Sequence, residues 1–463
     1  MATRSLIRFS ALATAALALT SCAAWRVDRA VQTATGLTSH WLCDDVYVSG
    51  LDAATAYAER VQPQPGMGLV DWGLRWQLDP AARQVTVSVA GGFESRAVHR
   101  PGLGCVALPA GETPAPAEPA PVFDAVQASQ PPIAGPALVE TTNPALAAAL
   151  TRALQPDRRH QTKAVLVLRD GRLIAERYAP GIGVDTPLLG FSMTKTTVNA
   201  LVGILVRQGR LNVDAPAPVP AWADAADPRH AITVAQLLRQ TSGLDLPQNN
   251  SGFDPSTQIL YSVRDKAAAI TAAPLAAAPG TRHAYADPNY LLLSRIVRDQ
   301  AGGSAHEVLR FAQRELFGPL GMARVTLDID ATGTPVGAAH MLAPARDWAR
   351  LGQLYLDDGM AGPTRILPAG WVGWSTTPTL ATGYGAGLWT NRLGAQRHPD
   401  WGVPWGLANA PADAFFARGF MGQFIVVIPS ERLVIVRLSV SHTKGDDIEE
   451  TDRIVGEVRA ALN

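Results

Sequence analysis

The sequence predicts a mixed α/β (α+β) fold in which helices cover an antiparallel sheet. Strand-like runs at residues 164–168 and 174–178 flank a turn at 169–172, whose Asp-Gly pair is typical of a β-hairpin. The segment 415–438 holds two further strand-like runs around a Pro-Ser-Glu-Arg turn. Apolar residues across 198–206 recur at the helical period, which predicts a buried helix between these strand pairs. We expect the last two strands to join the first two in one sheet.

The chain divides into a small N-terminal α+β domain, a linker and a larger C-terminal domain. For 463 residues, two domains are the natural expectation. Residues 22–108 form the first unit, with an alternating stretch at 84–89 that is typical of a half-buried strand. Residues 109–137 are rich in Pro and Ala and predict an extended linker. We expect the catalytic domain at 138–463, and the N-terminal domain could be a spacer or a cap over the active site.

The first residues predict export. Two arginines precede a short apolar run at 11–19, which ends in Leu-Thr-Ser-Cys22, and this pattern resembles a bacterial lipoprotein processing site. We expect a signal peptide at 1–21, a lipid on Cys22 and a body tethered in the cell envelope, facing the periplasm. Ala23 lacks the aspartate that often retains such proteins at the inner membrane, which favours the outer membrane. An ordinary signal peptide with a coincidental cysteine is the alternative.

The cysteine count fits an exported protein. If Cys22 carries lipid, Cys43 and Cys105 remain, and an even pair in this setting predicts a disulfide, with two buried free thiols as the alternative. Neither lies near a His or Cys cluster in the sequence, so we expect no metal site. The net charge is zero, with 17% charged residues, which provides no basic field for a nucleic-acid partner.

Ser192 and Lys195 are the strongest catalytic candidates. Residues three apart share one face of a helix, so the lysine lies one turn from the serine. A serine hydroxyl is a weak nucleophile and needs a base. Lysine can be that base only if burial or neighbouring positive charge lowers its pKa. A solvated lysine in the first turn of a core helix is the alternative interpretation.

Other nucleophiles and bases are weaker candidates. Ser242 lies in a Thr-Ser-Gly sequence that is typical of a turn after a helix. His283 and His340 are candidate bases, but isolated histidines of this kind are more often structural or solvated. The Gly-x-Ser-x-Gly pattern is absent, which argues against the nucleophile elbow of α/β-hydrolases.

Three further segments follow in an order that resembles a known family. These are 232–244, a Tyr-Ala-Asp-Pro-Asn-Tyr stretch at 285–290, and 415–438. Over residues 138–463 the chain resembles serine hydrolases of the class C β-lactamase type, which include DD-peptidases and esterases. The segment 341–359 looks most like the 6-aminohexanoate-dimer hydrolases among them. The resemblance implies a β-lactamase-like sheet sandwiched by helices, an all-helical region and no metal or organic cofactor.

The resemblance also assigns roles to residues. It implies that Ser192 is the nucleophile, that Lys195 is its companion base, and that Tyr285 passes a proton to the leaving group. The backbone amides of Ser192 and Phe420 would form the oxyanion hole, and Gly419 would belong to the substrate-binding strand.

Two substrate-binding positions depart from the family pattern. Asp287 stands where relatives usually carry asparagine, and an ionised aspartate can accept but not donate a hydrogen bond. The last strand has no Lys-Thr-Gly. Arg418 could supply the missing positive charge, although strand alternation could turn it away. Both departures weaken the β-lactamase interpretation more than the serine-hydrolase interpretation.

We therefore expect an exported serine hydrolase that cleaves a small or peptide-like amide or ester through an acyl-enzyme. Activity as a β-lactamase or DD-peptidase is one alternative. A catalytically idle module that binds peptidoglycan peptides in the envelope is another. The sequence leaves the natural substrate open, because the course of the loop at 246–262 cannot be inferred from it.

Overall fold

The larger domain is built on one antiparallel sheet of six strands. The computed structural model describes residues 26–109, 111–112, 120–123, 125–155, 159–394, 396–397, 402, 404–442 and 445–463. The prediction that the strands at 164–178 and 415–438 join in one sheet is confirmed. In spatial order the strands are β12 (Trp389–Thr390), β13 (Phe415–Gly419), β14 (Gln423–Ile428), β15 (Leu433–Ser441), β5 (His160–Arg169) and β6 (Arg172–Tyr178).

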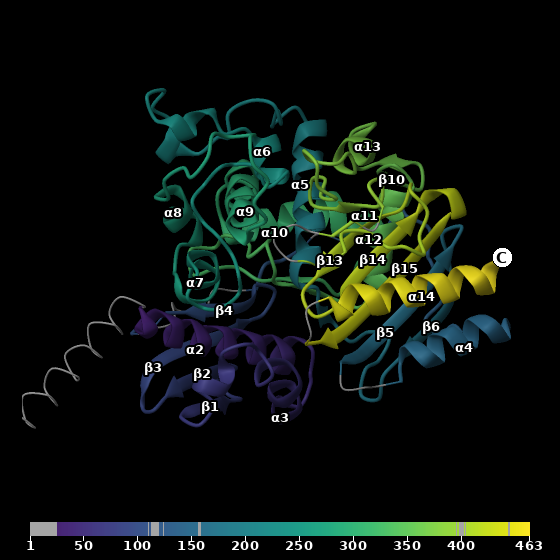
Figure 1. Cartoon of the computed structure of the whole chain (residues 1–463), viewed down its shortest axis with the longest axis horizontal. Coiled ribbons are helices and arrows are strands. Elements are labelled where there is room, and N and C mark those ends of the chain that lie inside the picture. Colours follow the sequence, from purple (N-terminus) through teal and green to yellow (C-terminus); the bar gives the residue numbers. More distant parts are fainter. Residues whose placement is uncertain are drawn as a thin grey trace, which may run out of the picture.

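Helices cover both faces of this sheet. Figure 1 shows the face that carries one yellow helix and one blue helix. Alternate residues of each strand face opposite sides. Val165 and Val167 belong to a core with α4 (Pro144–Ala153) and α14 (Asp446–Leu462). Leu166 belongs to the core that includes α5 (Thr194–Arg207) and α12 (Ala345–Leu356). Because both faces are buried, successive residues of each strand are apolar, and the strands appear in the sequence as continuous apolar runs.

The segment 415–438 forms three strands where the sequence analysis expected two. A tight turn between Gly419 and Gln423 splits the first run, and these two residues pair to close the hairpin. Within the turn, Met421 and Gly422 both have positive φ, at 63° and 92°. The apolar Phe and Met of the turn hide it from a pattern search, because turns are usually recognised by polar residues, Gly and Pro.

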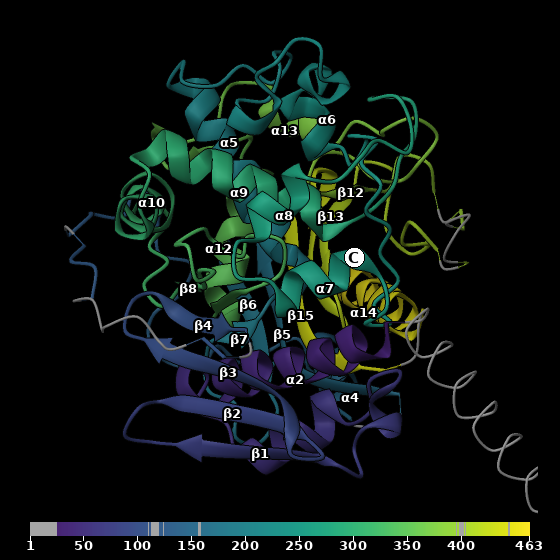
Figure 2. The same ribbon diagram turned by 90° about the vertical axis from the view of Figure 1, so that its left-hand side faces the viewer.

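An all-helical region lies beside the sheet, as the resemblance implied. Its helices pack around α9 (Figure 2). They are α6 (Val234–Leu238), α7 (Pro255–Ser262), α8 (Lys266–Thr271), α9 (Asp287–Ala301) and α10 (Ala305–Ala312).

Short elements connect the two regions. The short strands are β7 (Leu188–Leu189), β8 (Thr326–Leu327), β9 (Met341–Ala343), β10 (Met360–Ala361) and β11 (Thr364–Arg365). The short helices are α11 (Gly318–Leu320) and α13 (Trp371–Ser375), and the helical turns are η4 (Phe191–Met193), η5 (Pro220–Trp222), η6 (Pro228–Ala231), η7 (Gln313–Phe317) and η8 (Pro429–Glu431).

The N-terminal domain places a long helix, α2 (Val27–Cys43), on a four-stranded antiparallel sheet (Figure 2). The alternating stretch at 84–89 is a strand whose inward residues are buried, as its pattern predicted. The strands are β1 (Leu74–Asp79), β2 (Gln84–Val89), β3 (Gly92–Arg100) and β4 (Gly104–Leu108). The remaining elements are α3 (Ala53–Ala56) and the helical turns η1 (Asp44–Val48), η2 (Tyr57–Val61) and η3 (Met67–Leu69).

The N-terminal domain packs directly against the larger one. Helix α2 lies along α7, and Gly36 makes this approach possible, because a Cβ there would come within 2.2 Å of the carbonyl oxygen of Tyr261. The described part of the predicted linker also packs on the large domain: the amides of Ser129 and Gln130 donate to the carbonyl of Pro319, and Ile133 is buried.

The predicted disulfide between Cys43 and Cys105 is confirmed, with Cα atoms 6.0 Å apart. It joins the end of α2 to β4 and closes a loop of 62 residues. Among the helices of the described residues, none has the length and apolarity needed to span a bilayer. The expected signal peptide at 1–21 and Cys22 lie outside the described residues.

Candidate active site

Ser192 and Lys195 meet at the entrance to helix α5. Ser192 lies half-buried in the helical turn η4, and Lys195 follows in the first turn of α5. The Nζ atom of Lys195 lies 2.9 Å from Oγ of Ser192. The lysine side chain is 1% exposed. A buried ammonium in contact with a reachable hydroxyl is a costly arrangement, so these two groups mark a functional site.

Lys195 is held as an ammonium by negative and polar neighbours. Besides Ser192, its Nζ atom donates to Oδ1 of Asp287 at 2.5 Å and to the carbonyl of Ala338 at 2.8 Å. Burial alone would lower the pKa of Lys195, but the Asp287 carboxylate and then the Tyr285 phenol reverse this and raise it above its ordinary value. The lowered pKa that Lys195 would need to act as the base is therefore not found in the resting site. Asp287, which stands where the family usually has a neutral asparagine, is the first of the groups that raise this pKa.

Tyr285 lies beside this pair, as expected. It lies two residues before the start of α9, and the Nζ atom of Lys195 lies 5.1 Å from the centroid of its ring. The ring stacks on Trp389 at 5.7 Å and meets Tyr384 edge-on at 5.4 Å. Trp389 and Tyr384 thus hold the tyrosine in place, while the interaction with Lys195 brings the phenol into the same cluster as Ser192.

Asp287 belongs to the cluster around Lys195 and does not face an open substrate site. It is buried at the first turn of α9. Its Oδ1 atom accepts from Lys195, and its Oδ2 atom accepts from Nε2 of Gln248 at 2.8 Å. The Asp287 amide in turn donates to Oε1 of Gln248 at 2.6 Å. The expected substrate-binding role of Asp287 is thus corrected to one of holding Lys195. Sequence analysis missed Gln248 because it lies in the loop whose course could not be inferred.

The predicted oxyanion-hole segments lie in contact. At Gly419, a Cβ would come within 2.1 Å of the carbonyl oxygen of Gly190, so only glycine allows β13 to approach η4 this closely. The next residue, Phe420, packs its ring edge-on against Phe191 at 5.6 Å. The amides of Ser192 and Phe420 therefore belong to adjacent segments, which is the arrangement that an oxyanion hole needs.

Arg418 does not face the serine. Its guanidinium forms two hydrogen bonds of 2.9 Å with Asp447 of α14 and lies over the ring of Phe424. It therefore points to the face of the sheet covered by α4 and α14, whereas its neighbour Ala417 faces the side of α5. The expectation that Arg418 replaces the lysine of Lys-Thr-Gly is wrong, because strand alternation turns it away.

The weaker candidates lie elsewhere in the fold. Ser242 is buried in the turn after α6, where its Oγ accepts from the amide of Leu244 at 3.5 Å. His283 packs against Tyr384, with ring centroids 5.5 Å apart. His340 is fully buried, so it is structural and not solvated.

His340 belongs to a buried cluster with His40, Asp44 and Asp328. One ligand atom from each lies within 4.8 Å of the others, which is the spacing of a possible metal site. The two imidazoles, however, stack with an interplanar angle of 7° and centroids 3.8 Å apart. An ion must lie in the plane of each ring that binds it, and two parallel stacked rings cannot both satisfy this with one ion. The donor set therefore fits a hydrogen-bonded cluster better than a metal centre.

Comparisons with known proteins agree with this fold. Residues 147–459 match the Beta-lactamase family, which is well over half of the chain. The chain belongs to the Beta-lactamase family. It is a serine hydrolase with the family's mixed α/β fold, as the sequence analysis expected.

Several relatives are named hydrolases. A 6-aminohexanoate-dimer hydrolase from Paenarthrobacter ureafaciens is 29% identical over 226 residues, which cover 46% of this chain and 56% of that protein. The chain thus matches little more than half the length of this curated relative. A solved candidate 6-aminohexanoate-dimer hydrolase from Bacillus anthracis has a TM-score of 0.55 and 22% identity, covering 67% of this chain and 81% of that one.

Other solved relatives carry different names on the same fold. A penicillin-binding protein homologue from Caulobacter crescentus has a TM-score of 0.53 and 17% identity, covering 70% of this chain and 99% of that one. EstA from Arthrobacter nitroguajacolicus has a TM-score of 0.53 and 16% identity, covering 70% and 98%. At these identities the likeness shows the fold alone.

Proposed function

We propose that this chain cleaves an amide or ester through an acyl-enzyme on Ser192. The observation that carries the proposal is the buried ammonium of Lys195, 2.9 Å from the Ser192 hydroxyl oxygen. All three N–H groups of this ammonium have acceptors, namely Ser192, Asp287 and Ala338. Lys195 therefore acts through its positive charge and fixes the orientation of the serine, and another group takes the serine's proton.

Tyr285 is that proton acceptor in our proposal. Because Ser192 accepts a hydrogen bond from Lys195, its own O–H is free to point to another oxygen. In its ionised form, beside the Lys195 ammonium, Tyr285 takes the proton as Oγ bonds to the substrate carbonyl carbon. Tyr285 then gives the proton to the departing nitrogen or oxygen as that bond breaks. A water repeats the sequence on the acyl-enzyme, releases the acid and returns the proton to Ser192.

The oxyanion of each tetrahedral intermediate would lie between the amides of Ser192 and Phe420. Loss of one such donor costs roughly 100- to 1,000-fold in rate in well-studied hydrolases. The close approach of Gly419 to Gly190 supports this assignment, since it holds the two amide-bearing segments together.

For the substrate, we propose a short linear amide or ester, in the manner of 6-aminohexanoate oligomers. The curated relative named for such a substrate supports this choice. The Phe420 side chain, 40% exposed beside the oxyanion segment, offers an apolar contact to an aliphatic chain. Arg418 is engaged by Asp447 on the far face, which disfavours the carboxylate recognition that a β-lactam or DD-peptide needs.

We further propose that the protein is exported and lipid-anchored at Cys22 in the cell envelope. The N-terminal sequence pattern supports this, and a disulfide between Cys43 and Cys105 fits an oxidising compartment.

A substrate panel on the purified protein tests the reaction and the substrate class together. The panel holds the 6-aminohexanoate linear dimer, p-nitrophenyl butyrate and nitrocefin. We expect turnover of the dimer or the ester and none of nitrocefin; nitrocefin turnover alone would favour the β-lactamase alternative. Ser192→Ala should abolish both turnover and labelling by a fluorophosphonate, while the matched control Ser242→Ala keeps both. Labelling that survives in Ser192→Ala would overturn the assignment, and a wild type without turnover or labelling would favour an idle binding module.

A further inference from the structure

The last turn of α2, in the N-terminal domain, lies against the segment that carries Ser192. Trp41 is 2% exposed. Its indole meets the ring of Phe191 edge-on at 5.2 Å and lies 6.4 Å from the ring of Phe420. Its Nε1 donates to the hydroxyl of Tyr261 at 3.1 Å, which fixes the orientation of the indole. Trp41 thus packs on the residue before the Ser192 amide and on Phe420, which carries the other proposed oxyanion amide.

Phe191 needs this support because its backbone is strained. Its φ is 46°, in the left-handed region that residues other than glycine rarely adopt. Such strain persists only where the surroundings enforce it, and it is common at active sites. Two residues of the N-terminal domain pack on the Phe191 ring: Trp41 and Arg60, whose Cζ atom lies 5.3 Å from the centroid. The strained residue that presents Ser192 is therefore held from outside the catalytic domain.

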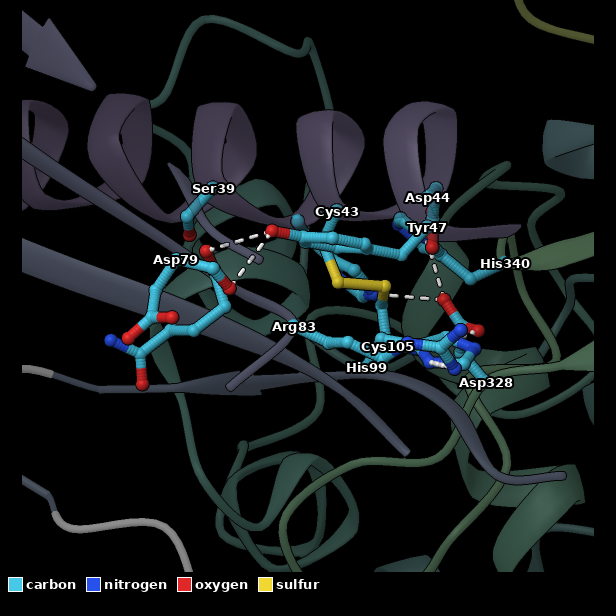
Figure 3. Close-up of a disulfide and its surroundings, with 12 residues drawn as sticks. Ser39, Cys43, Asp44, Tyr47, Asp79, Arg83, His99, Cys105, Asp328 and His340 are labelled. Carbon is cyan, nitrogen blue, oxygen red and sulfur yellow. Dashed lines mark hydrogen bonds and ion pairs between the residues drawn. A yellow bond between two sulfur atoms is a disulfide. The ribbon is translucent and has the colours of Figure 1, made fainter. Parts of the chain in front are cut away.

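A second contact reaches Lys195. At the end of α2, His40 bonds to Asp328 at 2.9 Å and Asp44 bonds to His340 at 3.0 Å, with all four side chains fully buried. Figure 3 shows Asp44, Asp328 and His340 next to the disulfide. His340 lies two residues after Ala338, whose carbonyl accepts from Lys195. The cluster therefore fixes the backbone that holds the ammonium.

The same segment is tied to the serine turn. The amide of Gly190 donates to the carbonyl of Met341 at 2.9 Å, and the amide of Met341 donates to Oγ1 of Thr194 at 3.2 Å. The disulfide adds a covalent restraint, because it joins Cys43 of α2 to Cys105. The amide of Cys105 in turn donates to Oδ1 of Asp328 at 3.0 Å, which links this restraint to the cluster. The end of α2 is thus fixed on one side and pressed against the catalytic turn on the other.

We propose that Trp41 is a positioning residue of the active site, and that the N-terminal domain is in this way a required part of the enzyme and not a spacer. The inference rests on the proposed function of Ser192. Trp41 acts through Phe191 and Phe420, whose backbone places the two amides of the oxyanion hole. Without the indole, Phe191 can relax towards negative φ and carry the Ser192 amide away from the reacting carbonyl.

This role predicts a defect in kcat. A misplacement of about 1 Å at a reacting centre costs on the order of 100-fold in rate. We expect Trp41→Ala to lower kcat roughly 10- to 100-fold with KM changed less than about threefold, because donors that act on the oxyanion stabilise the transition state more than the bound substrate. Trp41→Phe keeps an aromatic ring against Phe191 and should restore most of the rate.

The experiment compares Trp41→Ala, Trp41→Phe and Trp76→Ala in the full chain. Trp76 is a partly buried tryptophan of β1 that packs on Tyr57, so its loss tests general damage to the same domain. Thermal unfolding shows whether each variant is folded at the assay temperature, and a fluorophosphonate counts reactive serines. The expected result is a kcat defect in Trp41→Ala alone, with rescue in Trp41→Phe. Wild-type kcat in a folded Trp41→Ala, or an equal loss in Trp76→Ala, would overturn the proposal.

If Trp41→Ala does not fold, the positioning role is tested by comparing the kcat of Trp41→Phe with that of Trp41→Leu. A leucine fills space without an aromatic face, so a leucine variant as active as the phenylalanine variant would contradict the positioning role. Failure of the proposed function has a different signature: the wild type itself would show neither turnover nor fluorophosphonate labelling. Failure of the inference alone leaves an active wild type whose rate does not depend on Trp41.

Discussion

The ammonium of Lys195 lies 2.5 Å from the carboxylate of Asp287, in a site where the family resemblance leads one to expect a neutral asparagine. This single difference changes the electrostatics of the cluster. Burial is the largest single effect on Lys195, and by itself it would lower the pKa of the lysine. Asp287 and Tyr285 together outweigh it, so the pKa of Lys195 is raised. The resting site thus holds a fixed positive charge beside Ser192 and Tyr285.

Replacing Asp287 by asparagine should shift the pH dependence of catalysis to lower pH. Asp287 raises the pKa of Lys195, so its removal lets Lys195 lose its proton at a lower pH. If the ammonium form is the active one, the alkaline decline of kcat/KM then begins earlier in Asp287→Asn than in the wild type. The measurement is kcat/KM for an ester across the pH range, with fluorophosphonate labelling rates as a second probe.

The shape of that profile also separates two roles for Lys195. A rate that rises, and does not fall, as Lys195 loses its proton would contradict the ammonium role. Gln248→Ala is the matched control: it removes a neutral partner of Asp287 while leaving the charge pair. Its alkaline limb should move less than that of Asp287→Asn.

Removing the disulfide should lower the free energy of unfolding substantially. Cys43 and Cys105 are 62 residues apart, and the chain-entropy estimate for such a loop is about 4 kcal/mol. We expect the Cys43→Ala/Cys105→Ala double variant to unfold at a lower denaturant concentration than the wild type. Its free energy of unfolding should be lower by about 4 kcal/mol. Dithiothreitol should destabilise the wild type and leave the double variant unchanged. An equal response of both proteins to the reductant would contradict a disulfide in the native fold.

Gly36→Ala should destabilise the protein even though it lies inside a helix. Glycine to alanine within a helix usually stabilises by about 0.5–1 kcal/mol. At Gly36, however, the new Cβ would meet the carbonyl oxygen of Tyr261 at 2.2 Å, and overpacking of this kind costs roughly 1–3 kcal/mol. The control is Gly373→Ala in α13, where the added Cβ meets no atom within 4 Å and the usual gain is expected. Chemical denaturation of the two variants gives opposite signs if the α2–α7 contact is as close as described.

The parts of the site that sequence analysis found are those fixed by local rules. Helical spacing brings Lys195 to Ser192, and residue order places Tyr285 at the start of α9. For Arg418, the sequence left open which face of the sheet the side chain points to, because a register shift of one residue moves every side chain of a strand to the opposite face. The split of the 415–438 run into three strands depends on a turn built from Phe, Met and Gly, which resembles strand sequence.

The missed parts depend on contacts between distant segments. His40 and Asp328 are 288 residues apart, and Asp44 and His340 are 296 apart. No local pattern marks Trp41 as a neighbour of Phe191, since its helix reads as the core helix of a separate small domain. The histidines and aspartates of the cluster each have an ordinary local explanation, and only the fold shows that they meet.

Asp44→Asn should remove a loss of stability that the wild type shows as pH rises. Burial, and then the charge of Asp328, raise the pKa of Asp44 well above its usual range. A carboxyl whose pKa is raised on folding stabilises the protein below the unfolded pKa and loses that contribution as pH rises through the folded value. In the same cluster, burial lowers the pKa of His340 to about 3. Burial would raise the pKa of Asp328, but hydrogen bonds from His340 and His40 outweigh it and lower that pKa. A change at Asp44 alone therefore separates the slope of this carboxyl from the slopes of its neighbours.

The comparison stays below pH 8, because burial lowers the pKa of Lys266 to about 8 and adds an opposite slope beyond it. Asparagine imitates the protonated carboxyl at every pH, so the free energy of unfolding of Asp44→Asn should fall less steeply than that of the wild type. The limiting difference is about 1.4 kcal/mol per pH unit, the value for one proton. Urea unfolding at several pH values measures it. Parallel slopes for the two proteins would show that Asp44 is already ionised in the folded cluster, and that the end of α2 is held by charge attraction to its histidines.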